Sequence, residues 1–441
     1  MKKKMIGVIL LAIIVSASLF AGGSSAGSAG SSSGTKTIRM WTFLDPAKTD
    51  PRSVVLKAVI DNFEAANPGV KVQVEPQDWP TMTAKFLASM ASKTAPDINW
   101  CLQDEMGSVL DANALEPFEN LFLKNWTPAQ INDIADAQWD FAVRNGKHYQ
   151  VTLSKNMIVL FYREDLFKQN GIAIPKTWDD LFAAAKKLTG TDPATGIMRY
   201  GLGQSFVTSA GVDAQLFANM LLETQGSPFD SQGKANWAND NGKRALQWEV
   251  DSIKSGITPE SALTTSVDDV FLEFGAGKYA MMAGGSVRVP NVRQTASFDP
   301  NAVQLMLFPS FGGQKNSPGV MSGWSVGVWS GGPNKDLAGK FVEAMISPES
   351  DKLWVQTGGQ IPTRKSTTTA LASWLADPSR TYIKVISDGF ANAGWSQPTE
   401  FPVLGWKYDL NQAVQNVLVN NMSTDDALKA TVDQFNSRNS K

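Results

Sequence analysis

Strand and helix patterns alternate through residues 37–100, and this order constrains the fold more than any other feature of the chain. Alternating or continuous apolar residues predict strands over residues 37–43, 70–74 and 95–100. Between them, apolar residues at helical spacing predict helices over residues 54–66 and 81–92. Strands that alternate with helices are typical of a largely parallel sheet. The sequence therefore predicts an α/β fold.

The length of the chain predicts more than one folded body. From Thr35 onward it has roughly 400 residues, which exceeds the size that a single hydrophobic core usually reaches. Two lobes are therefore expected. Residues 22–34 contain only Gly, Ser and Ala, so they offer no apolar surface to bury and are predicted to form a flexible tether.

Residues 1–21 are predicted to be a secretory signal peptide. Three lysines, Lys2–Lys4, precede an apolar run from Met5 to Phe20, and small residues follow near Ala21. A membrane anchor is the alternative, but the run is short compared with the about 20 residues that a helix needs to span a bilayer. No cysteine stands at the expected cleavage site, so a lipoprotein is not expected. The segment therefore predicts that the protein is secreted across the inner membrane.

A second informative stretch lies at residues 144–188. Asn145-Gly146 predicts a tight hairpin turn. The apolar run over residues 157–162 predicts a strand that is buried on both faces, and a short helix over residues 164–170 follows. Thr177 is a predicted N-cap, with two aspartates in the first turn of its helix. These elements predict a buried strand near the middle of the chain.

Four blocks of this stretch resemble the extracellular solute-binding proteins of ABC sugar importers, the family that includes maltose-binding protein. The blocks are NGKHY (145–149), FYREDLF (161–167), GIAIPKTWDDL (171–181) and AKKL (185–188). Earlier in the chain, WT (41–42), FEAANPGVKV (63–72) and APDI (95–98) match the start of the same family. Residues 277–286, 322–329, 334–346 and 358–364 also resemble segments of the family, so the resemblance extends over nearly the whole chain after the tether.

The resemblance implies a two-lobed periplasmic-binding-protein-like fold of type II. Each lobe is then a mainly parallel sheet flanked by helices, and hinge segments join the two lobes. Residues 35–153 and 308–348 are expected in lobe 1, and residues 154–307 and 349–441 in lobe 2. The resemblance also implies a binding protein rather than an enzyme, which passes a carbohydrate to the membrane permease subunits of an ABC transporter.

Composition argues against several other classes of protein. The chain has 40 Lys and Arg against 42 Asp and Glu, so it lacks the basic field that nucleic-acid binding needs. One Cys excludes an intramolecular disulfide framework, and one His argues against a zinc site. We expect a monomer without metal or cofactor. Of the 14 Trp residues, about two-thirds are expected in the core, and the others are available to stack on sugar rings.

Candidate ligand contacts follow first from the rule that ligands bind outside the carboxyl ends of strands in such sheets. The rule selects seven residues at or after the three N-terminal strands: Trp41, Phe43, Asp78, Trp79, Trp100, Gln103 and Asp104. Trp41 also fits a half-buried strand residue. Asp104 also fits an exposed helix N-terminus, where a carboxylate is favourable.

Nine further candidates lie at later strand ends and in segments that the resemblance places at the cleft: Asn156, Gln204, Phe206, Gly285, Ser286, Gly323, Trp324, Arg364 and Trp395. Structural roles are the alternatives for several of them. Asn156 fits a turn cap, Gly285 a tight turn and Arg364 a surface ion pair. Val287 stands where the family usually has Trp, so stacking at that position is expected to be absent or supplied elsewhere.

Three functions remain open on the sequence. The favoured one is a periplasmic sugar-binding protein, for a mono- or oligosaccharide, whose lobes close on the ligand by bending at a hinge. A secreted glycoside hydrolase is the second, but it needs two carboxylates that flank one bond, and Asp104 and Glu105 are adjacent in sequence. The third is a binding protein for a non-sugar solute such as a peptide or an anion, and the number of tryptophans argues mildly against it.

Overall fold

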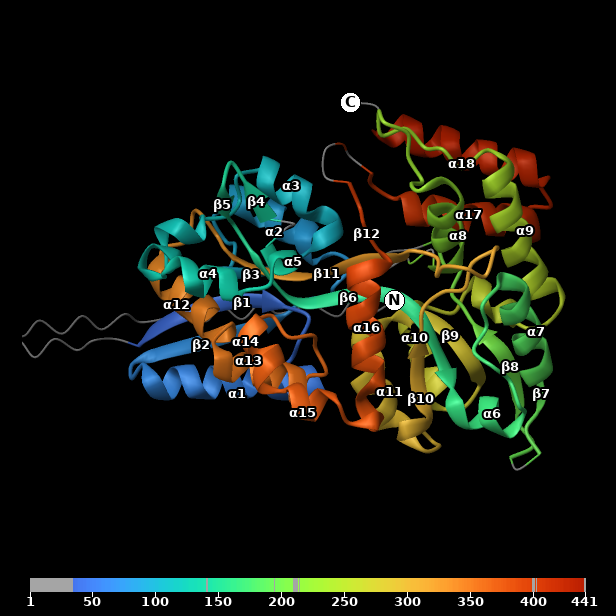
Figure 1. Ribbon diagram of the computed structural model, residues 1–441. Coiled ribbons are helices and arrows are strands. Elements are labelled where there is room, and N and C mark those ends of the chain that lie inside the picture. The colour runs from blue at the N-terminus through green and yellow to red at the C-terminus, as the bar shows by residue number, and fades with distance from the viewer. Residues whose placement is uncertain are drawn as a thin grey trace, which may run out of the picture. The chain divides into compact units, whose positions relative to one another are not determined.

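The computed structural model describes residues 35–139, 142–193, 195–208, 213, 215–398, 401 and 403–439. The predicted signal peptide and tether, residues 1–34, lie outside the described residues. From Lys36 onward the chain forms one compact unit, which contains two α/β lobes (Figure 1). Within the described ranges, no helix has both the length and the apolar character needed to cross a membrane.

The N-terminal part of the fold is the predicted parallel sheet. Strand β1 (Lys36–Thr42) lies between β2 (Val70–Pro76) and β3 (Ile98–Leu102), and both pairs are parallel. Helices α1 (Pro51–Ala66) and α2 (Met82–Ala91) make the two crossovers between these strands. This order confirms the predicted α/β fold. Because the strands are parallel, their carboxyl ends meet at one edge, and the loops after them share one region of space.

One long strand, β6 (Val151–Arg163), belongs to both lobes (Figure 1). Residues 151–157 pair with β11 (Gly319–Val328), which in turn pairs with β3 in lobe 1. Residues 158–163 pair with β9 (Tyr279–Gly285) and β10 (Val303–Met306) in lobe 2. All these pairs with β6 are antiparallel. The predicted central strand is therefore longer than its apolar core and carries the chain from one lobe to the other.

Lobe 2 extends the sheet beyond β9. Strand β8 (Met198–Gly203) is parallel to β9, and the short β7 (Gly190–Thr191) is antiparallel to β8. Helix α7 (Trp178–Leu188) packs against β8, and its N-cap is Thr177, as predicted: Thr177 and Asp180 form a reciprocal capping box.

The predicted hairpin turn is confirmed. Strands β4 (Val143–Arg144) and β5 (Lys147–His148) are joined by Asn145 and Gly146, with φ angles of 53° and 70°. Both angles lie in the left-handed region that a two-residue hairpin turn of this kind needs, and Asn-Gly is the pair that adopts it most readily.

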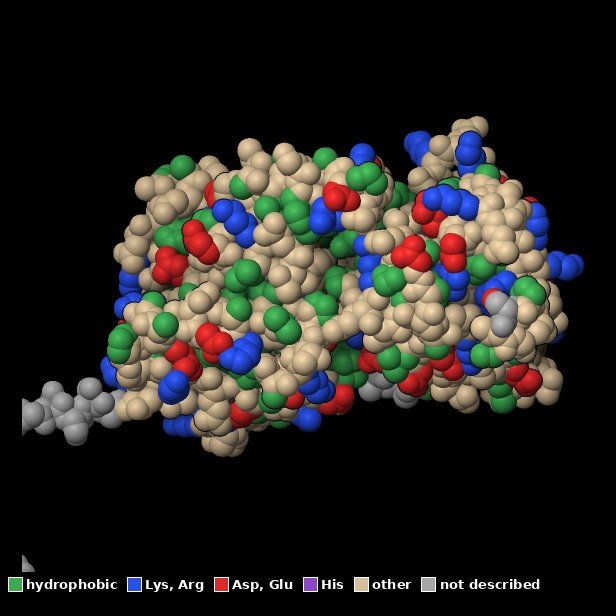
Figure 2. All heavy atoms as spheres, turned by 90° about the horizontal axis from the view of Figure 1, so that it is seen from below, with side chains coloured by type: hydrophobic (Ala, Val, Ile, Leu, Met, Phe, Trp, Pro, Cys, Tyr) green, Lys and Arg blue, Asp and Glu red, His purple; other side chains and the backbone are tan. Residues whose placement is uncertain are grey.

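The remaining elements, in chain order, are mostly helices that cover the sheet: α3 (Met106–Asp111), α4 (Pro128–Asp133), α5 (Asp136–Trp139), α6 (Glu164–Gln169), α8 (Gln215–Gln225), α9 (Asp240–Lys254), α10 (Val267–Gly275), α11 (Val289–Thr295), α12 (Lys335–Met345), α13 (Pro348–Gln356), α14 (Lys365–Ala370), α15 (Ala372–Leu375), α16 (Thr381–Asn392), β12 (Gly394–Ser396), α17 (Trp406–Leu418) and α18 (Thr424–Asn439). Acidic and basic side chains are interspersed on the face that Figure 2 shows.

The packing of α13 corrects the predicted lobe boundary after residue 348. Trp354 of α13 is buried in the same hydrophobic cluster as Met40 of β1 and Phe341 of α12, and α13 contacts α1. Ser347 caps α13 by accepting a hydrogen bond from the Ser350 N–H, so the chain turns back within lobe 1. Residues 348–356 therefore add to the core of lobe 1, not of lobe 2.

A buried acid in lobe 2 makes stability depend on pH. Glu249 of α9 is 1% exposed. Burial raises its pKa from 4.5 to about 8, although Gln204 and the Phe217 N–H donate hydrogen bonds to it. The folded protein therefore retains a proton that the unfolded chain releases at lower pH.

We expect the free energy of unfolding to fall as the pH rises from about 4.5 to about 8, and Glu249→Gln to remove this contribution. The slope from one group is at most about 1.4 kcal/mol per pH unit, because the unfolded state binds fewer protons over this range. Urea unfolding at several pH values measures it, with the exposed Glu260→Gln as the control. An identical slope for wild type and Glu249→Gln would contradict this role.

Candidate ligand-binding site

A cavity of about 130 Å³ lies between the two lobes, beside β6 and at the carboxyl ends of the N-terminal strands. We call it the aromatic pocket. The residues that line it come from both lobes: Phe43, Arg52, Trp79, Leu102, Asp104, Ser322, Gly323 and Trp324 from lobe 1, and Asn156, Ile158, Asp213, Val267, Asp268, Phe271, Gly285, Val287, Arg288 and Lys407 from lobe 2.

Three aromatic rings form the lobe 1 wall of this pocket. Phe43 follows β1, and its ring centroid lies 4.8 Å from that of Trp324 on β11. Trp79, which follows β2, meets Trp324 edge to face at 6.4 Å. The ladder between β11 and β6 shifts register between Trp324 and Ser325, an irregularity of the kind that re-aims a side chain beside a binding site. The wall offers flat apolar faces that suit the C–H face of a sugar ring.

An ion cluster lies at one end of the pocket and links the lobes. Asp104, in the turn after β3, accepts hydrogen bonds from the Ser322 hydroxyl at 2.9 Å and from Nζ of Lys407 at 3.0 Å. Lys407, in the first turn of α17, also lies 3.7 Å from a carboxylate oxygen of Asp213. Burial alone would lower the pKa of Lys407, but the two carboxylates raise it on balance, so the side chain stays charged.

Asn156 organises the part of the pocket where β6 passes between the lobes. Its Oδ1 accepts hydrogen bonds from the Ser286 hydroxyl and the Val287 N–H, both at 3.3 Å. A Cβ atom at Gly285 would lie only 2.6 Å from Nδ2 of Asn156. Gly285 is therefore needed because β9 approaches the Asn156 amide so closely.

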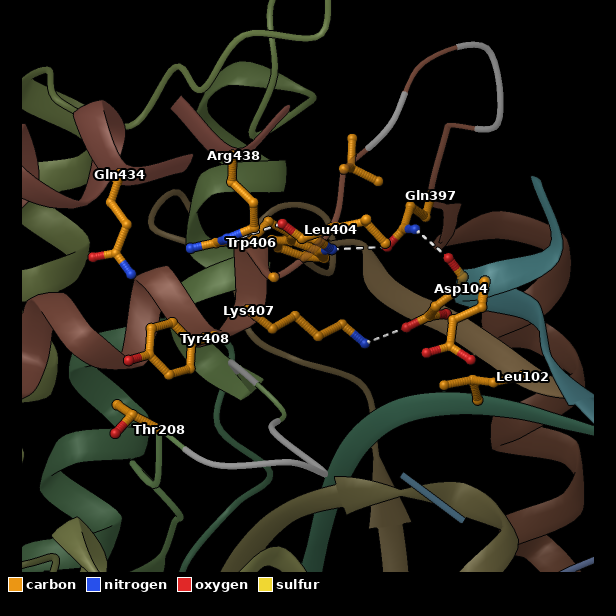
Figure 3. A pocket seen from close by; sticks show the side chains of 13 residues that line it. Leu102, Asp104, Thr208, Gln397, Leu404, Trp406, Lys407, Tyr408, Gln434 and Arg438 are labelled. Atoms are coloured by element: carbon orange, nitrogen blue, oxygen red, sulfur yellow. Dashed lines mark hydrogen bonds and ion pairs between the residues drawn. The ribbon is translucent and has the colours of Figure 1, made fainter. Parts of the chain in front are cut away.

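A second cavity, of about 600 Å³, adjoins the first (Figure 3). We call it the C-terminal pocket, since most of its lining lies in residues 397–438. It shares Leu102, Asp104 and Lys407 with the aromatic pocket. The Gln397 side chain donates to the Asp104 carbonyl at 2.9 Å and accepts from the Trp406 indole at 2.7 Å. The Asp104–Lys407 ion pair therefore stands where the two pockets meet.

Seven of the predicted contacts line the aromatic pocket: Phe43, Trp79, Asp104, Asn156, Gly285, Gly323 and Trp324. Ser286 lies beside it, bonded to Asn156. These residues remain the proposed ligand contacts. Asp104 is not the exposed helix N-terminus of the alternative interpretation, because Ser322 and Lys407 enclose its carboxylate.

Four predicted contacts are buried in the cores instead. Trp100 packs against Trp354 in lobe 1, and Phe206 lies in the main lobe 2 cluster. Gln103 donates to the Thr152 hydroxyl at 2.7 Å, and Gln204 is fully buried beside Glu249. These predictions are wrong in placement, since each side chain points into protein rather than into the cavity.

Three further candidates lie near the surface but outside both pockets. Trp41 is half-buried and its indole N–H donates to Glu75 at 2.8 Å, which matches the alternative of a strand residue. Asp78 is exposed and accepts a bond from the Thr81 hydroxyl. Trp395 packs on Trp406, with ring centroids 5.8 Å apart.

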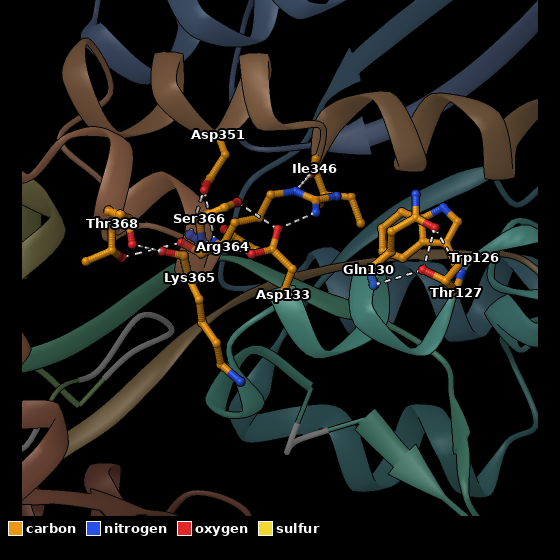
Figure 4. A network of polar contacts seen from close by, with 12 residues as sticks. Trp126, Thr127, Gln130, Asp133, Ile346, Asp351, Arg364, Lys365, Ser366 and Thr368 are labelled. Carbon is orange, nitrogen blue, oxygen red and sulfur yellow. Dashed lines mark hydrogen bonds and ion pairs between the residues drawn. The ribbon is translucent and has the colours of Figure 1, made fainter.

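Arg364 is also not a ligand contact, because it holds lobe 1 together (Figure 4). Its side chain is 7% exposed. It donates to the Ile346 carbonyl at 2.6 Å and to Asp133 at 2.9 Å, and its guanidinium lies over the Trp126 ring. Burial alone would raise the pKa of Asp133, but hydrogen bonds from Arg364 and Ser366 lower it on balance. Arg364 thus forms an inward ion pair, not the surface pair of the alternative interpretation.

Sequence reasoning missed five charged residues of the pocket, namely all of them except Asp104: Arg52, Asp213, Asp268, Arg288 and Lys407. Arg52, Asp268 and Lys407 lie in the first turns of α1, α10 and α17, and Arg288 directly precedes α11. The strand-end rule could have found Arg52, since the edge that carries the strand ends also carries the N-termini of the helices that follow. The other four depend on how lobe 2 packs.

Together, the crossing strand, the two lobes and the cavity between them define a two-lobed α/β binding protein. A family model described as bacterial extracellular solute-binding protein matches residues 58–381, well over half of the chain. The chain therefore belongs to that family, which is a family of binding proteins.

Solved structures share the fold. The GacH receptor of Streptomyces glaucescens, crystallised unliganded and with acarbose, superposes with a TM-score of 0.77 at 21% identity, covering 92% of this chain and 99% of that one. A maltose-bound MalE3 of T. maritima gives a TM-score of 0.76 at 21% identity, covering 91% and 99%. These likenesses confirm the predicted two-lobed fold class.

A curated relative is similar in sequence. The mannitol-binding protein of Pseudomonas aeruginosa (strain PAO1) is 23% identical over 296 residues, which cover 66% of this chain and 65% of the relative.

We expect Arg364→Met to lower the free energy of unfolding by about 3 kcal/mol, because it leaves Asp133 without its buried partner. Urea unfolding measures the loss. The control is Arg144→Met, which breaks an exposed ion pair with Asp111 and should change stability by less than about 1 kcal/mol. A variant that lost solute binding but kept its stability would contradict the structural role.

Proposed function

We propose that this protein captures a sugar or a similar polyhydroxylated solute in the aromatic pocket and delivers it to the permease subunits of an ABC importer. The observation that carries the proposal is the wall of Phe43, Trp79 and Trp324, which lines a cavity between the lobes together with hydrogen-bonding groups. Flat apolar faces combined with a few placed polar groups are what a sugar ring requires.

The polar side of the pocket supports the same ligand class. Asp104 and Asn156 are held by partners from the neighbouring strands and helices, so their remaining hydrogen-bonding capacity points in fixed directions. Pre-organised acceptors and donors of this kind favour hydroxyl groups without a large loss of side-chain entropy. The names of the relatives agree, since they refer to mannitol, acarbose and maltose.

The two lobes are suited to closing around the solute. Asp104 and Lys407 join lobe 1 to lobe 2, as do the Trp79 indole and Asp268 at 3.4 Å. These contacts are few compared with the continuous ladder along β6, so we infer that the lobes separate at the contacts and bend at the strand. The closed, ligand-bound form would then present a different surface from the open form, and the permease would recognise the loaded protein by that surface.

Export and retention complete the proposal. We infer that residues 1–21 direct secretion and are cleaved, that the protein acts as a periplasmic monomer without a lipid anchor, and that it binds no nucleic acid. The N-terminal sequence supports the first inference, and the near balance of acidic and basic residues supports the last.

Isothermal titration of the wild type against neutral and acidic mono- and disaccharides and polyols tests the function. We expect at least one of them to bind. Trp324→Ala should lower the affinity for that ligand by about five- to thirtyfold, because a stacking face is lost. Trp126→Phe is the matched control, since its indole bonds Glu343 outside both pockets. No binding across the panel, or an unchanged affinity in Trp324→Ala, would contradict the proposal.

A further inference from the structure

Arg52 is a buried cation for which the described part of the protein supplies no acceptor. It lines the aromatic pocket and is 6% exposed. Its guanidinium lies 5.1 Å from the centre of the Phe43 ring, and its Nε–H, which is shielded from solvent, has no hydrogen-bond partner among the described residues. A buried charged donor without a partner is strongly unfavourable.

The local position of Arg52 adds to this imbalance. It is the second residue of α1, a helix of 16 residues, where the helix dipole is positive and disfavours a cation. Burial and the charge of Arg288 together lower the pKa of Arg52 to about 9, against the opposing effects of Asp50 and Asp268. Burial, the helix dipole and the charge of Arg288 all oppose the charge of Arg52, and no folding requirement explains its position. A charged group in such a place indicates a role in binding.

Arg288 brings a second guanidinium to the same part of the pocket. It forms an ion pair with Asp268 and lies 5.2 Å from the centre of the Phe271 ring. Asp268 also accepts from the Trp79 indole. Among the residues that line the pocket, Asp268 is therefore the one carboxylate at this end beside two guanidinium groups, so the lining carries excess positive charge here; Asp50, the N-cap of α1, lies outside the lining.

The opposite charge gathers at the other end. Asp104 and Asp213 share the single cation Lys407. The contacts divide the charges into two groups: Arg288 pairs with Asp268 at one end, whereas Lys407 pairs with Asp104 and Asp213 at the other. The pocket thus has an acidic end suited to sugar hydroxyls, which can donate, and a basic end where two guanidinium groups meet one lining carboxylate.

We propose that the natural ligand is an anionic sugar, whose carboxylate or phosphate group binds Arg52 and Arg288 while its ring lies on Phe43 and Trp324. This inference rests on the proposed function and narrows it to one class of sugar. An anion offers the acceptor that the Arg52 Nε–H lacks and offsets the excess charge, whereas a neutral hydroxyl would do only the first. Guanidinium groups suit both acid types, since each presents paired oxygens.

The experiment compares matched acidic and neutral sugars by isothermal titration of the full-length protein. D-glucuronate is measured against D-glucose, D-galacturonate against D-galactose, and glucose 6-phosphate separates phosphate from carboxylate. We expect an acidic sugar to bind at least about tenfold tighter than its neutral counterpart, as charge-assisted hydrogen bonds imply. Preference for the uronate or for the phosphate identifies the acid group.

Arg52→Met tests the residue directly. We expect it to lower the affinity for the acidic sugar by about ten- to a hundredfold, to lower the affinity for a neutral sugar by a clearly smaller factor, and to keep or raise the melting temperature of the unliganded protein. Arg39→Met is the control, because Arg39 belongs to the same lobe but pairs with Glu75 outside the pocket.

Three results would overturn the inference. Equal or tighter binding of the neutral sugars would refute it and leave the proposed function intact. If Arg52→Met loses affinity equally for acidic and neutral sugars and also melts at a lower temperature, Arg52 has a structural role instead. If no sugar binds, whether acidic or neutral, the result refutes both the proposed function and this inference.

Discussion

The backbone hydrogen bonds of β6 are the constraint on which the site depends. The first half of the strand is paired in lobe 1 and the second half in lobe 2, so the pocket forms where the partners change. Asn156 lies at that change, and Trp324 is paired with Ser154 just before it. Nearly every residue of β6 is buried, and a slip by one residue would turn each side chain to the opposite face. The strand therefore fixes the aromatic and polar walls together.

Local patterns predicted those parts of the fold that local chemistry determines. The first two crossovers follow from the period of the apolar residues. The Asn145-Gly146 turn follows from the ease with which these residues adopt left-handed backbone, and the Thr177 cap follows from its side-chain oxygen. All three signals can be read in the sequence. The lobe assignment of α13 was wrong because it depends on the contact between Trp354 and a core assembled from distant segments. No pattern within residues 348–356 indicates which of two cores the helix joins.

The site was predictable in part, for the same reason. Phe43, Trp79 and Asp104 were found because they follow strands whose carboxyl ends share an edge. Trp100 was misplaced since β3 continues to Leu102, so that Trp100 lies within the strand and not after it. Gln204 does follow its strand, but it packs beneath α9 beside Glu249. A strand-end rule thus locates the edge, whereas burial by the next helix decides which side chains reach the cavity.

Two basic residues show how the pocket is only partly completed by the protein. Lys407 and Arg52 both lie in the first turn of a helix, where the dipole disfavours a cation. Asp104 and Asp213 compensate Lys407 from the opposite lobe and the adjoining segment, and they hold its charge in place. Arg52 has the same local disadvantage and a comparable burial, but its Nε–H has no hydrogen-bond partner among the described residues, and its guanidinium lies over the face of Phe43. An anionic group of the ligand would compensate the charge of Arg52, as Asp104 and Asp213 compensate the charge of Lys407 at the other end of the pocket.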